Sequence, residues 1–224
     1  MRPPSLLTLL LLAASALPAD SFTPIFGSPE PAVATTLDTV YGAGGYTRVS
    51  DDLDQFWQGD AILSVVAISS YAGATQAFGL CQICDGSDDT LFAPSITADG
   101  ISMQPLTAFA QSTLSLGPGL FRFFNDPSGV AQVGRVYSDP TLNPLQGDHM
   151  VTFSINGQPN VYALAFEDWL FTSDPESDRD YNDLVVQVSF LRNDIQTTPE
   201  PASALLLGGG LLLIARLARR RQAS

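Results

Sequence analysis

The chain contains no lysine, one histidine and two cysteines in 224 residues. All ten basic residues are arginines, and only five of them lie between residues 20 and 198, where 22 of the 23 acids are found. Five positive against 22 negative charges leave this stretch with a formal net charge of −17. Binding to nucleic acid needs clustered cations that neutralise phosphates, so the composition excludes this function. An acidic surface suits cations, basic partners or solubility in salty surroundings.

The scarcity of histidine also limits the kinds of catalysis. His149 is the single histidine and no Gly-x-Ser-x-Gly motif occurs, so a nucleophilic triad has no support. A pair of carboxylates could hydrolyse a glycoside, for example Glu167 or Glu176 with a neighbouring aspartate. These acids fall in one short loop, however, rather than on opposite walls of a cleft. We therefore predict that the protein is not an enzyme.

The two cysteines, in Cys81-Gln-Ile-Cys84, are too few for a zinc site in a chain with one histidine. In an exported protein this pair is expected to close a small disulfide loop, and a redox-active thiol pair or two free thiols are the alternatives. The stretch DGSDD at 85–89 follows directly and is interpreted as a solvated turn, with a second, weaker cation site as the alternative.

The apolar run at the N-terminus is too short for a membrane span. Residues 1–19 combine Arg2, an apolar stretch at 6–12 and a small-residue end, which is typical of a secretory signal peptide cleaved after Ala16 or Ala19. A true membrane anchor is the alternative, but a spanning helix needs about 20 apolar residues. We therefore expect export through the Sec machinery.

The C-terminal segment, residues 197–224, consists of Pro199-Glu200-Pro201, an uncharged stretch at 202–215 interrupted by glycines, and an arginine cluster that includes Arg219, Arg220 and Arg221. As a helix the uncharged stretch would cover only about 21 Å of a hydrocarbon core about 30 Å thick. It is therefore a poor permanent anchor. The positive-inside rule keeps the arginines cytoplasmic and leaves the Pro-Glu-Pro sequence on the outer side, accessible to a processing enzyme.

These three parts together resemble the PEP-CTERM family of bacterial sorting signals. The resemblance implies a single short transmembrane sorting helix that is recognised by an exosortase and anchors the chain only transiently in the inner membrane. It also implies removal of the tail and release to the cell surface or into an exopolysaccharide matrix. A plain tail anchor is the alternative. The resemblance is confined to the tail and says nothing about the role of the rest of the chain.

The stretch between the two ends, residues 20–196, is rich in Gly, Pro, Thr, Ser and Asp rather than in helix formers, which predicts an all-β extracellular domain. Residues 20–60 are interpreted as an entry segment. Strands are predicted at 61–69, 77–83, 106–116, 119–125 and 130–137, about ten residues apart with turn residues between them. This spacing favours an antiparallel β-sandwich, jelly-roll-like in its arrangement.

The clearest strands lie near the end of this domain. Residues 150–155 and 161–166 flank the turn NGQPN and alternate apolar side chains, which predicts a hairpin. Residues 184–191 place Leu184 and alternate residues after it on one apolar face, so a third strand is expected beside or across from the hairpin.

The pairing of the hairpin brings acids together. If Ile155 pairs with Val161, then Asp148 lies opposite Asp168, and the acidic loop at 167–183 leaves from the same end. Six oxygen-bearing side chains are expected to converge there, with Asp148 as a further candidate: Glu167, Asp168, Asp178, Asp180, Asn182 and Asp183.

Carboxylates this close together repel one another unless something neutralises them, and a hard cation does so. Calcium takes six to eight oxygen ligands, which this loop supplies densely, so we predict a calcium site. The pattern Asp178-x-Asp180-x-Asn182 matches the first half of an EF-hand loop, but Asp183 stands where that loop needs glycine. The alternative is a network of Asx turns that only fixes the start of the next strand.

The sequences FEDW at 166–169 and DRDYNDLVVQV at 178–188, with GDHMVTFSI upstream, resemble a bacterial extracellular domain family of unknown function. The most recognisable part is residues 147–191. The resemblance implies a β-sandwich, makes the same six residues candidate calcium ligands, and implies no established catalytic role.

Four aromatic residues, Trp57, Tyr162, Trp169 and Phe171, could form a platform for sugar stacking, although core packing explains them equally well. The sequence therefore predicts an exported surface or matrix protein with a calcium-stabilised rim. The alternative is a lectin-like matrix module that binds exopolysaccharide without metal.

Overall fold

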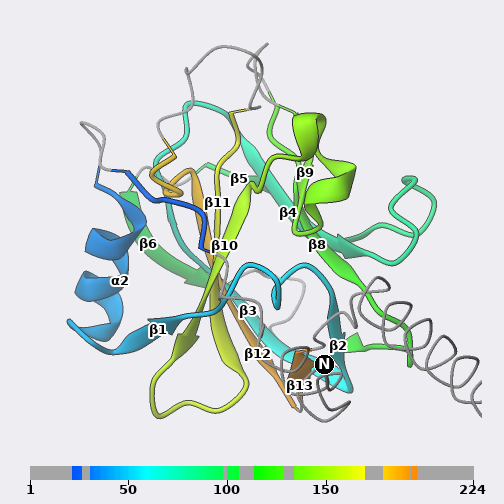
Figure 1. Cartoon of the computed structure of the whole chain (residues 1–224), viewed down its shortest axis with the longest axis horizontal. Helices are drawn as coiled ribbons and strands as arrows, with labels where there is room; N and C mark the ends of the chain where they lie inside the picture. The colour runs from blue at the N-terminus through cyan, green and yellow to red at the C-terminus, as the bar shows by residue number, and fades with distance from the viewer. Residues whose placement is uncertain are drawn as a thin grey trace, which may run out of the picture.

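The computed structural model of the chain describes residues 22–26, 31–97, 100–105, 114–128, 134–169, 179–191 and 193–195 (Figure 1). In chain order these contain α2 (Val33–Tyr41), β1 (Tyr46–Arg48), β2 (Trp57–Gly59), β3 (Ala61–Ser70), β4 (Gln76–Cys81), β5 (Thr90–Ile96), β6 (Gly100–Pro105), β7 (Leu114–Ser115), β8 (Arg122–Asn125), β9 (Val136–Tyr137), the 3-10 turns η2 (Pro140–Leu142) and η3 (Pro144–Gln146), β10 (Met150–Ile155), β11 (Val161–Phe166), β12 (Leu184–Phe190) and β13 (Asn193–Ile195). The segments 1–19 and 197–224, for which we predict a signal peptide and a sorting tail, lie outside these ranges.

The strands form two principal antiparallel sheets. A seven-stranded sheet has the order β1-β10-β11-β12-β3-β6, with β7 also paired to β3. A four-stranded sheet has the order β5-β4-β8-β9, and β13 and β2 form a small separate pair. The predicted all-β antiparallel architecture is therefore confirmed for the described residues.

The main core lies between the two sheets. Phe78 and Phe123 from the four-stranded sheet and Leu164 and Val186 from the seven-stranded sheet are all fully buried in one cluster. Trp57, fully buried, packs edge-on against Phe123 with ring centroids 5.3 Å apart. Burial of each large apolar side chain contributes about 1.5–3 kcal/mol, so this cluster holds the sheets face to face.

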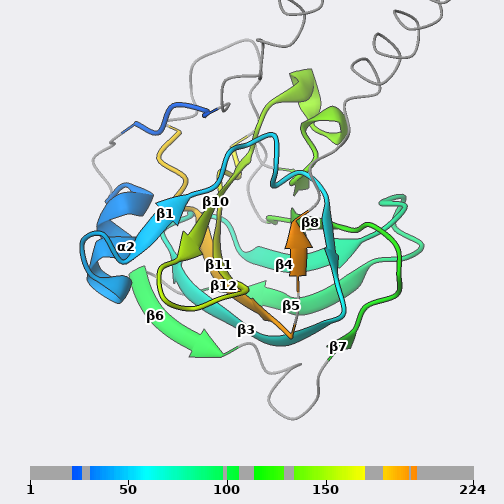
Figure 2. The same cartoon turned by 60° about the horizontal axis from the view of Figure 1, so that its bottom comes forward.

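The opposite face of the seven-stranded sheet is covered by α2, which lies beside β1 in both views (Figures 1 and 2). Val33 and Leu37 are buried against the outward side chains of β10, β11 and β12, including Val151 and Val185. These strands are therefore buried on both faces. This explains why their sequences are almost continuously apolar.

The helix α2 was not predicted, since residues 20–60 were interpreted as an entry segment. Its apolar residues Val33, Leu37 and Tyr41 recur every four positions and lie on one helical face. The helix has nine residues, of which three are threonines and two are valines, and this gives only a weak helical preference, so most of its stability comes from packing. Gly42, with φ of 82°, ends it.

The predicted hairpin register is confirmed. Met150 pairs with Phe166 and Val151 with Ala165, which is the register that places Ile155 opposite Val161. The third strand lies beside the hairpin, because Leu164 pairs with Val186.

The other strand predictions are confirmed in part. The predicted strands at 61–69, 77–83 and 119–125 correspond to β3, β4 and β8 with shifted ends. Of 130–137 the structure describes 134–137, which contain β9, and most of 106–116 lies outside the described residues. Strands β5 and β6 were missed because glycine, proline and serine interrupt their apolar pattern. Within the described ranges, no helix has the length and apolar character needed to cross a bilayer.

Candidate cation site at one end of the sandwich

Three of the predicted ligands meet where β11 ends and β12 begins. Glu167 and Asp168 directly follow β11, and Asp183 directly precedes β12. Because Phe166 pairs with Leu184 in the antiparallel ladder, these two chain segments lie next to each other. One carboxylate oxygen from each acid lies within 4.8 Å of those of the other two. In the part of the chain that the structure describes, this is the one group of three acids, histidines or cysteines that meets this condition.

Backbone hydrogen bonds fix the three acids in place. The Asp168 amide donates to Oδ2 of Asp183 at 2.7 Å, and the Glu167 amide donates to the carbonyl of His149 at 3.0 Å. The Trp169 amide donates to Oε1 of Glu167 at 3.3 Å. Glu167 and Asp168 are 1% and 4% exposed, so their carboxylates are held in a largely water-free setting. We name Glu167, Asp168 and Asp183 the acid triad.

Electrostatic repulsion within the acid triad is strong. Burial raises the pKa of Asp183 well above its usual range, and the charges of Asp168 and Glu167 raise it further. A buried carboxylate facing two others is unfavourable in the charged form. A divalent cation would relieve this by supplying positive charge to all three oxygens, which is the arrangement that hard-ion sites use.

The DYND part of the loop is held differently. The Asn182 amide donates to Oδ1 of Asp180 at 3.1 Å, and its side-chain Nδ2 donates to Oδ2 of Asp180 at 2.7 Å and to the carbonyl of Pro31 at 2.9 Å. The Asp180 carbonyl in turn accepts from the amide of Val33, the first residue of α2. Asp180 and Asn182 therefore show the Asx-turn chemistry that was the alternative interpretation, and they lie outside the acid triad. Asp178 lies outside the described residues.

The backbone of this loop adopts an uncommon conformation. Arg179 and Tyr181 have φ angles of 54° and 55°, in the left-handed region that bulky residues rarely occupy. Tyr181 is fully buried, and its hydroxyl donates to the carbonyl of Asp148 at 2.8 Å. This anchoring compensates for the strain in the loop backbone.

Asp148 belongs to a neighbouring acidic group. Thr23 links two carboxylates, since its hydroxyl donates to Oδ2 of Asp148 at 2.7 Å and its amide donates to Oδ2 of Asp51. Arg48 donates to the other oxygen of Asp51 at 3.0 Å. Burial, followed by the charge of Asp51, raises the pKa of Asp148 to about 7, although the hydrogen bond from Thr23 lowers it. Burial and the charge of Asp148 also raise the pKa of Asp54 well above its usual range.

His149 has a structural role. Its ring Nδ1 lies 3.0 Å from the carbonyl of Glu167, an acceptor, so Nδ1 carries the proton. Burial lowers the pKa of His149 to about 4, and the ring is therefore neutral at physiological pH. It supports the segment that carries the acid triad and adds no positive charge to it.

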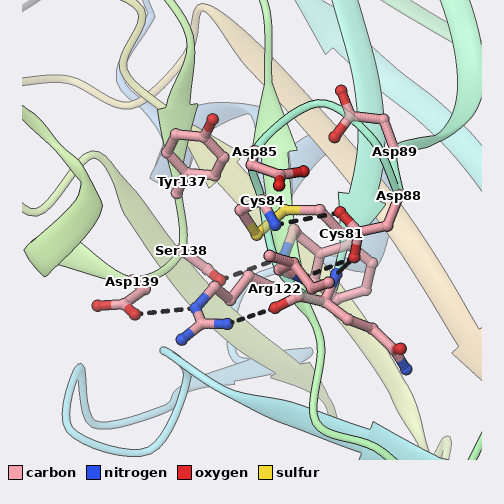
Figure 3. Close-up of a disulfide and its surroundings, with 12 residues drawn as sticks. Cys81, Cys84, Asp85, Asp88, Asp89, Arg122, Tyr137, Ser138 and Asp139 are labelled. Atoms are coloured by element: carbon pink, nitrogen blue, oxygen red, sulfur yellow. Dashed lines mark hydrogen bonds and ion pairs between the residues drawn. A yellow bond between two sulfur atoms is a disulfide. The ribbon is translucent and has the colours of Figure 1, made fainter.

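The disulfide predicted for Cys81 and Cys84 is formed, and it closes a short loop at the end of β4 (Figure 3). Asp88 accepts hydrogen bonds from the amides of Gln82, Ile83 and Cys84 at 2.7, 2.6 and 3.1 Å. These donors lower the pKa of Asp88. Its oxygens are therefore directed at backbone N–H groups, which agrees with a turn at 85–89 rather than a cation site.

Two of the four aromatic residues considered for a sugar platform pack in the core, as the alternative interpretation has it. Trp57 is fully buried and stacks on Phe190 with centroids 5.8 Å apart, so it belongs to the core. Tyr162 packs against the same Trp57 ring, with centroids 5.3 Å apart. Trp169 is half-buried, and Phe171 lies outside the described residues.

Sequence reasoning missed several residues around the site. Asp51, Asp54, Gln76 and Asn125 come from segments far away in the chain, and no local motif marks them. The single available signal was the acidic run at 51–54, which falls in the segment 20–60 that we interpreted as an entry segment.

A family model for a domain of unknown function, DUF4114, matches residues 88–191. The matched segment includes all three members of the acid triad and the strands β10, β11 and β12. No curated protein and no solved structure gives a significant match to the chain.

Proposed function

We propose that the protein is an exported, non-enzymatic surface or matrix protein whose β-sandwich binds calcium through Glu167, Asp168 and Asp183. The observation that carries this proposal is the acid triad itself, three carboxylate oxygens within 4.8 Å of one another at the junction of two core strands. Like charges at this separation in a buried setting are costly without a counter-ion.

Calcium suits this donor set better than zinc or magnesium does. Carboxylate oxygens are hard ligands, whereas zinc favours nitrogen and sulfur. Magnesium demands near-ideal octahedral geometry and keeps several waters, whereas calcium accepts irregular sets of six to eight oxygens. Asp178, just before the described loop, remains a predicted further ligand.

The role of such a cation would be structural. It would join the end of β11 to the start of β12 and neutralise the loop between them. A surface or matrix protein outside the cell meets calcium at concentrations that a weak site can use.

Export and sorting form the second part of the proposal. A signal peptide at 1–19 would direct the chain through the Sec machinery, and an exosortase would remove the tail at 197–224. The support is the resemblance of Pro199-Glu200-Pro201 and the arginine cluster to PEP-CTERM signals. Mass spectrometry of the released protein tests this part: the proposal requires that Arg219, Arg220 and Arg221 are absent.

A carbohydrate-binding module without metal is the second candidate, because Trp169 is half-buried directly beside Asp168. An exopolysaccharide that stacks on this ring would change its fluorescence, with or without calcium. A fluorescence response that survives EDTA would favour this candidate.

Thermal unfolding of the purified full-length protein in EDTA, magnesium and calcium tests the calcium site. A ligand that binds only the folded state stabilises it by about 2.7 kcal/mol at a hundredfold excess over Kd. We expect a calcium-specific rise in Tm that is lost in Asp183→Asn and kept in Asp85→Asn, a matched change in the exposed disulfide loop. Equal Tm values in EDTA and calcium would refute the proposal.

A further inference from the structure

The acid triad is supported by a buried side chain from the opposite sheet. Gln76, the first residue of β4, is fully buried. Its Nε2 donates to Oδ2 of Asp168 at 2.6 Å and to the carbonyl of Ala74 at 3.1 Å. Its Oε1 accepts from Nδ2 of Asn125 at 2.5 Å. Asn125, the last residue of β8, is also fully buried.

These contacts fix the orientation of the Gln76 amide. Both hydrogens on Nε2 are donated, and Oε1 accepts one hydrogen bond. If the amide were flipped, its oxygen would face the Asp168 carboxylate and its NH2 group would face the NH2 group of Asn125. In a buried setting no water can replace the lost bonds, and each unsatisfied group costs about 1–3 kcal/mol. Asp168 is therefore held with Oδ2 as an acceptor toward Gln76.

The relay from Asn125 through Gln76 to Asp168 crosses the sandwich. Asn125 and Gln76 lie on neighbouring strands of the four-stranded sheet, and Asp168 follows β11 of the seven-stranded sheet. If Gln76 could not donate, the Asp168 carboxylate would be freer to rotate about its last bond. With Gln76 in place, Oδ2 is tethered and the orientation of the whole carboxylate, including Oδ1, is set.

We propose that Gln76 is a positioning residue for the cation ligand Asp168, and that the Asn125–Gln76 relay couples cation binding to the four-stranded sheet. The inference rests on the proposed calcium site. It adds Gln76 to that site and links calcium binding to the four-stranded sheet. Outer partners that orient a metal ligand typically affect metal affinity by about 10- to 100-fold when they are removed.

Calcium titration calorimetry on the full-length protein and a Gln76→Met variant tests the positioning role. Methionine has a similar length but cannot donate to Asp168, so we expect the Kd for calcium to rise about 10- to 100-fold. Gln187→Met is the matched control, because Oε1 of Gln187 accepts from the Tyr41 hydroxyl at 2.7 Å and does not contact the acid triad. Its Kd should stay at the wild-type value.

Hydrogen exchange provides a readout that a merely structural role would not change. In the wild type, calcium should slow exchange at 76–81 and 122–125 as well as at 184–190. In Gln76→Met the protection at 184–190 should remain at saturating calcium, whereas the protection at 76–81 and 122–125 should be lost.

A second variant covers the case in which Gln76→Met does not fold. Asn125→Leu leaves Gln76 in place but removes the donor that fixes its amide, and it should raise the Kd by a smaller factor. A Kd within about twofold of wild type in a folded Gln76→Met or Asn125→Leu protein would overturn the positioning role while leaving the calcium site standing. No calcium binding by the wild-type protein would overturn both.

Discussion

Two parts of the molecule are rich in acids, yet their carboxylates are held in opposite ways. In the disulfide loop, Asp88 is directed at three backbone N–H groups, and these donors lower its pKa. In the acid triad, Asp183 faces two other carboxylates in a buried setting, which raises its pKa. The loop satisfies its charge with local donors, whereas the acid triad brings like charges together.

This difference indicates what separates a cation site from a turn. Acids are dense both in DGSDD and in DRDYND, so composition alone does not distinguish them. The balance between donors and like charges around each carboxylate does: Asp88 accepts from three amides, whereas Asp183 accepts from the Asp168 amide and faces two other carboxylates. By this criterion Asp180, which accepts from Asn182 twice, resembles Asp88 more than Asp183.

Asp148, in the acidic group next to the triad, should give a large effect of pH on stability. The pKa of Asp148 is about 7 in the folded protein, against an ordinary value of 3.8, so the folded state holds this proton more tightly. Its contribution to stability is fully present below about pH 4 and is lost as the pH rises through about 7. A rise of the pKa from 3.8 to about 7 corresponds to roughly 4 kcal/mol, and the interaction of Asp51 with Asp148 makes this an upper value.

Asp148→Asn should remove the part of the pH dependence that comes from Asp148. An asparagine keeps an oxygen for the Thr23 hydroxyl and replaces the titrating oxygen with a neutral amide group, so the variant should be more stable than wild type at about pH 8. Urea unfolding between about pH 4 and pH 8 measures the slope of stability against pH. A slope as steep in Asp148→Asn as in wild type would show that another group is responsible.

The acid triad should respond to neutralisation with a gain in stability when no calcium is present. Asp183→Asn keeps an acceptor for the Asp168 amide and removes one of three mutually repelling groups. In EDTA we expect the free energy of unfolding to rise by roughly 2 kcal/mol, about half the Coulomb energy of two unit charges at about 4 Å in an effective dielectric of about 20. Calcium should then add nothing.

The opposite sign would change the interpretation of the triad. If Asp183→Asn destabilises the protein in EDTA, its carboxylate is satisfied by donors, as Asp88 is. The acid triad and the disulfide loop would then hold their carboxylates in the same way.

Local patterns in the sequence predicted the part of the site that depends on pairing within the hairpin. Alternating apolar residues indicated the hairpin register, and that register placed His149 beside Glu167, as the backbone hydrogen bond between them confirms. The pairing of Phe166 with Leu184, which brings Asp183 to Asp168, was not predicted, because the sequence left the third strand either beside or across from the hairpin.

What could not be predicted depends on contacts between distant segments and on single backbone angles. Gln76 reaches Asp168 from 92 positions away, and no periodicity links the two. Tyr181, between Asp180 and Asp183, has a left-handed φ of 55°, and its residue type gives no preference for that region. Patterns among residues close together in the sequence predict neither contacts between distant segments nor the backbone angles of single residues.

The smallest expected effect concerns the disulfide loop. Asp88→Ala removes the acceptor for three amides, but the loop is largely exposed and water replaces part of the loss, so we expect destabilisation by about 1 kcal/mol, similar to the loss of a helix cap. Asp85→Ala, which loses the amide and hydroxyl of Ser87 as donors, should cost less. Neither change should alter the response of Tm to calcium, because local donors already hold both carboxylates. A calcium response weakened by Asp88→Ala as much as by Asp183→Asn would mean that the disulfide loop also binds the ion, and that amide donors do not separate a turn from a cation site in this protein.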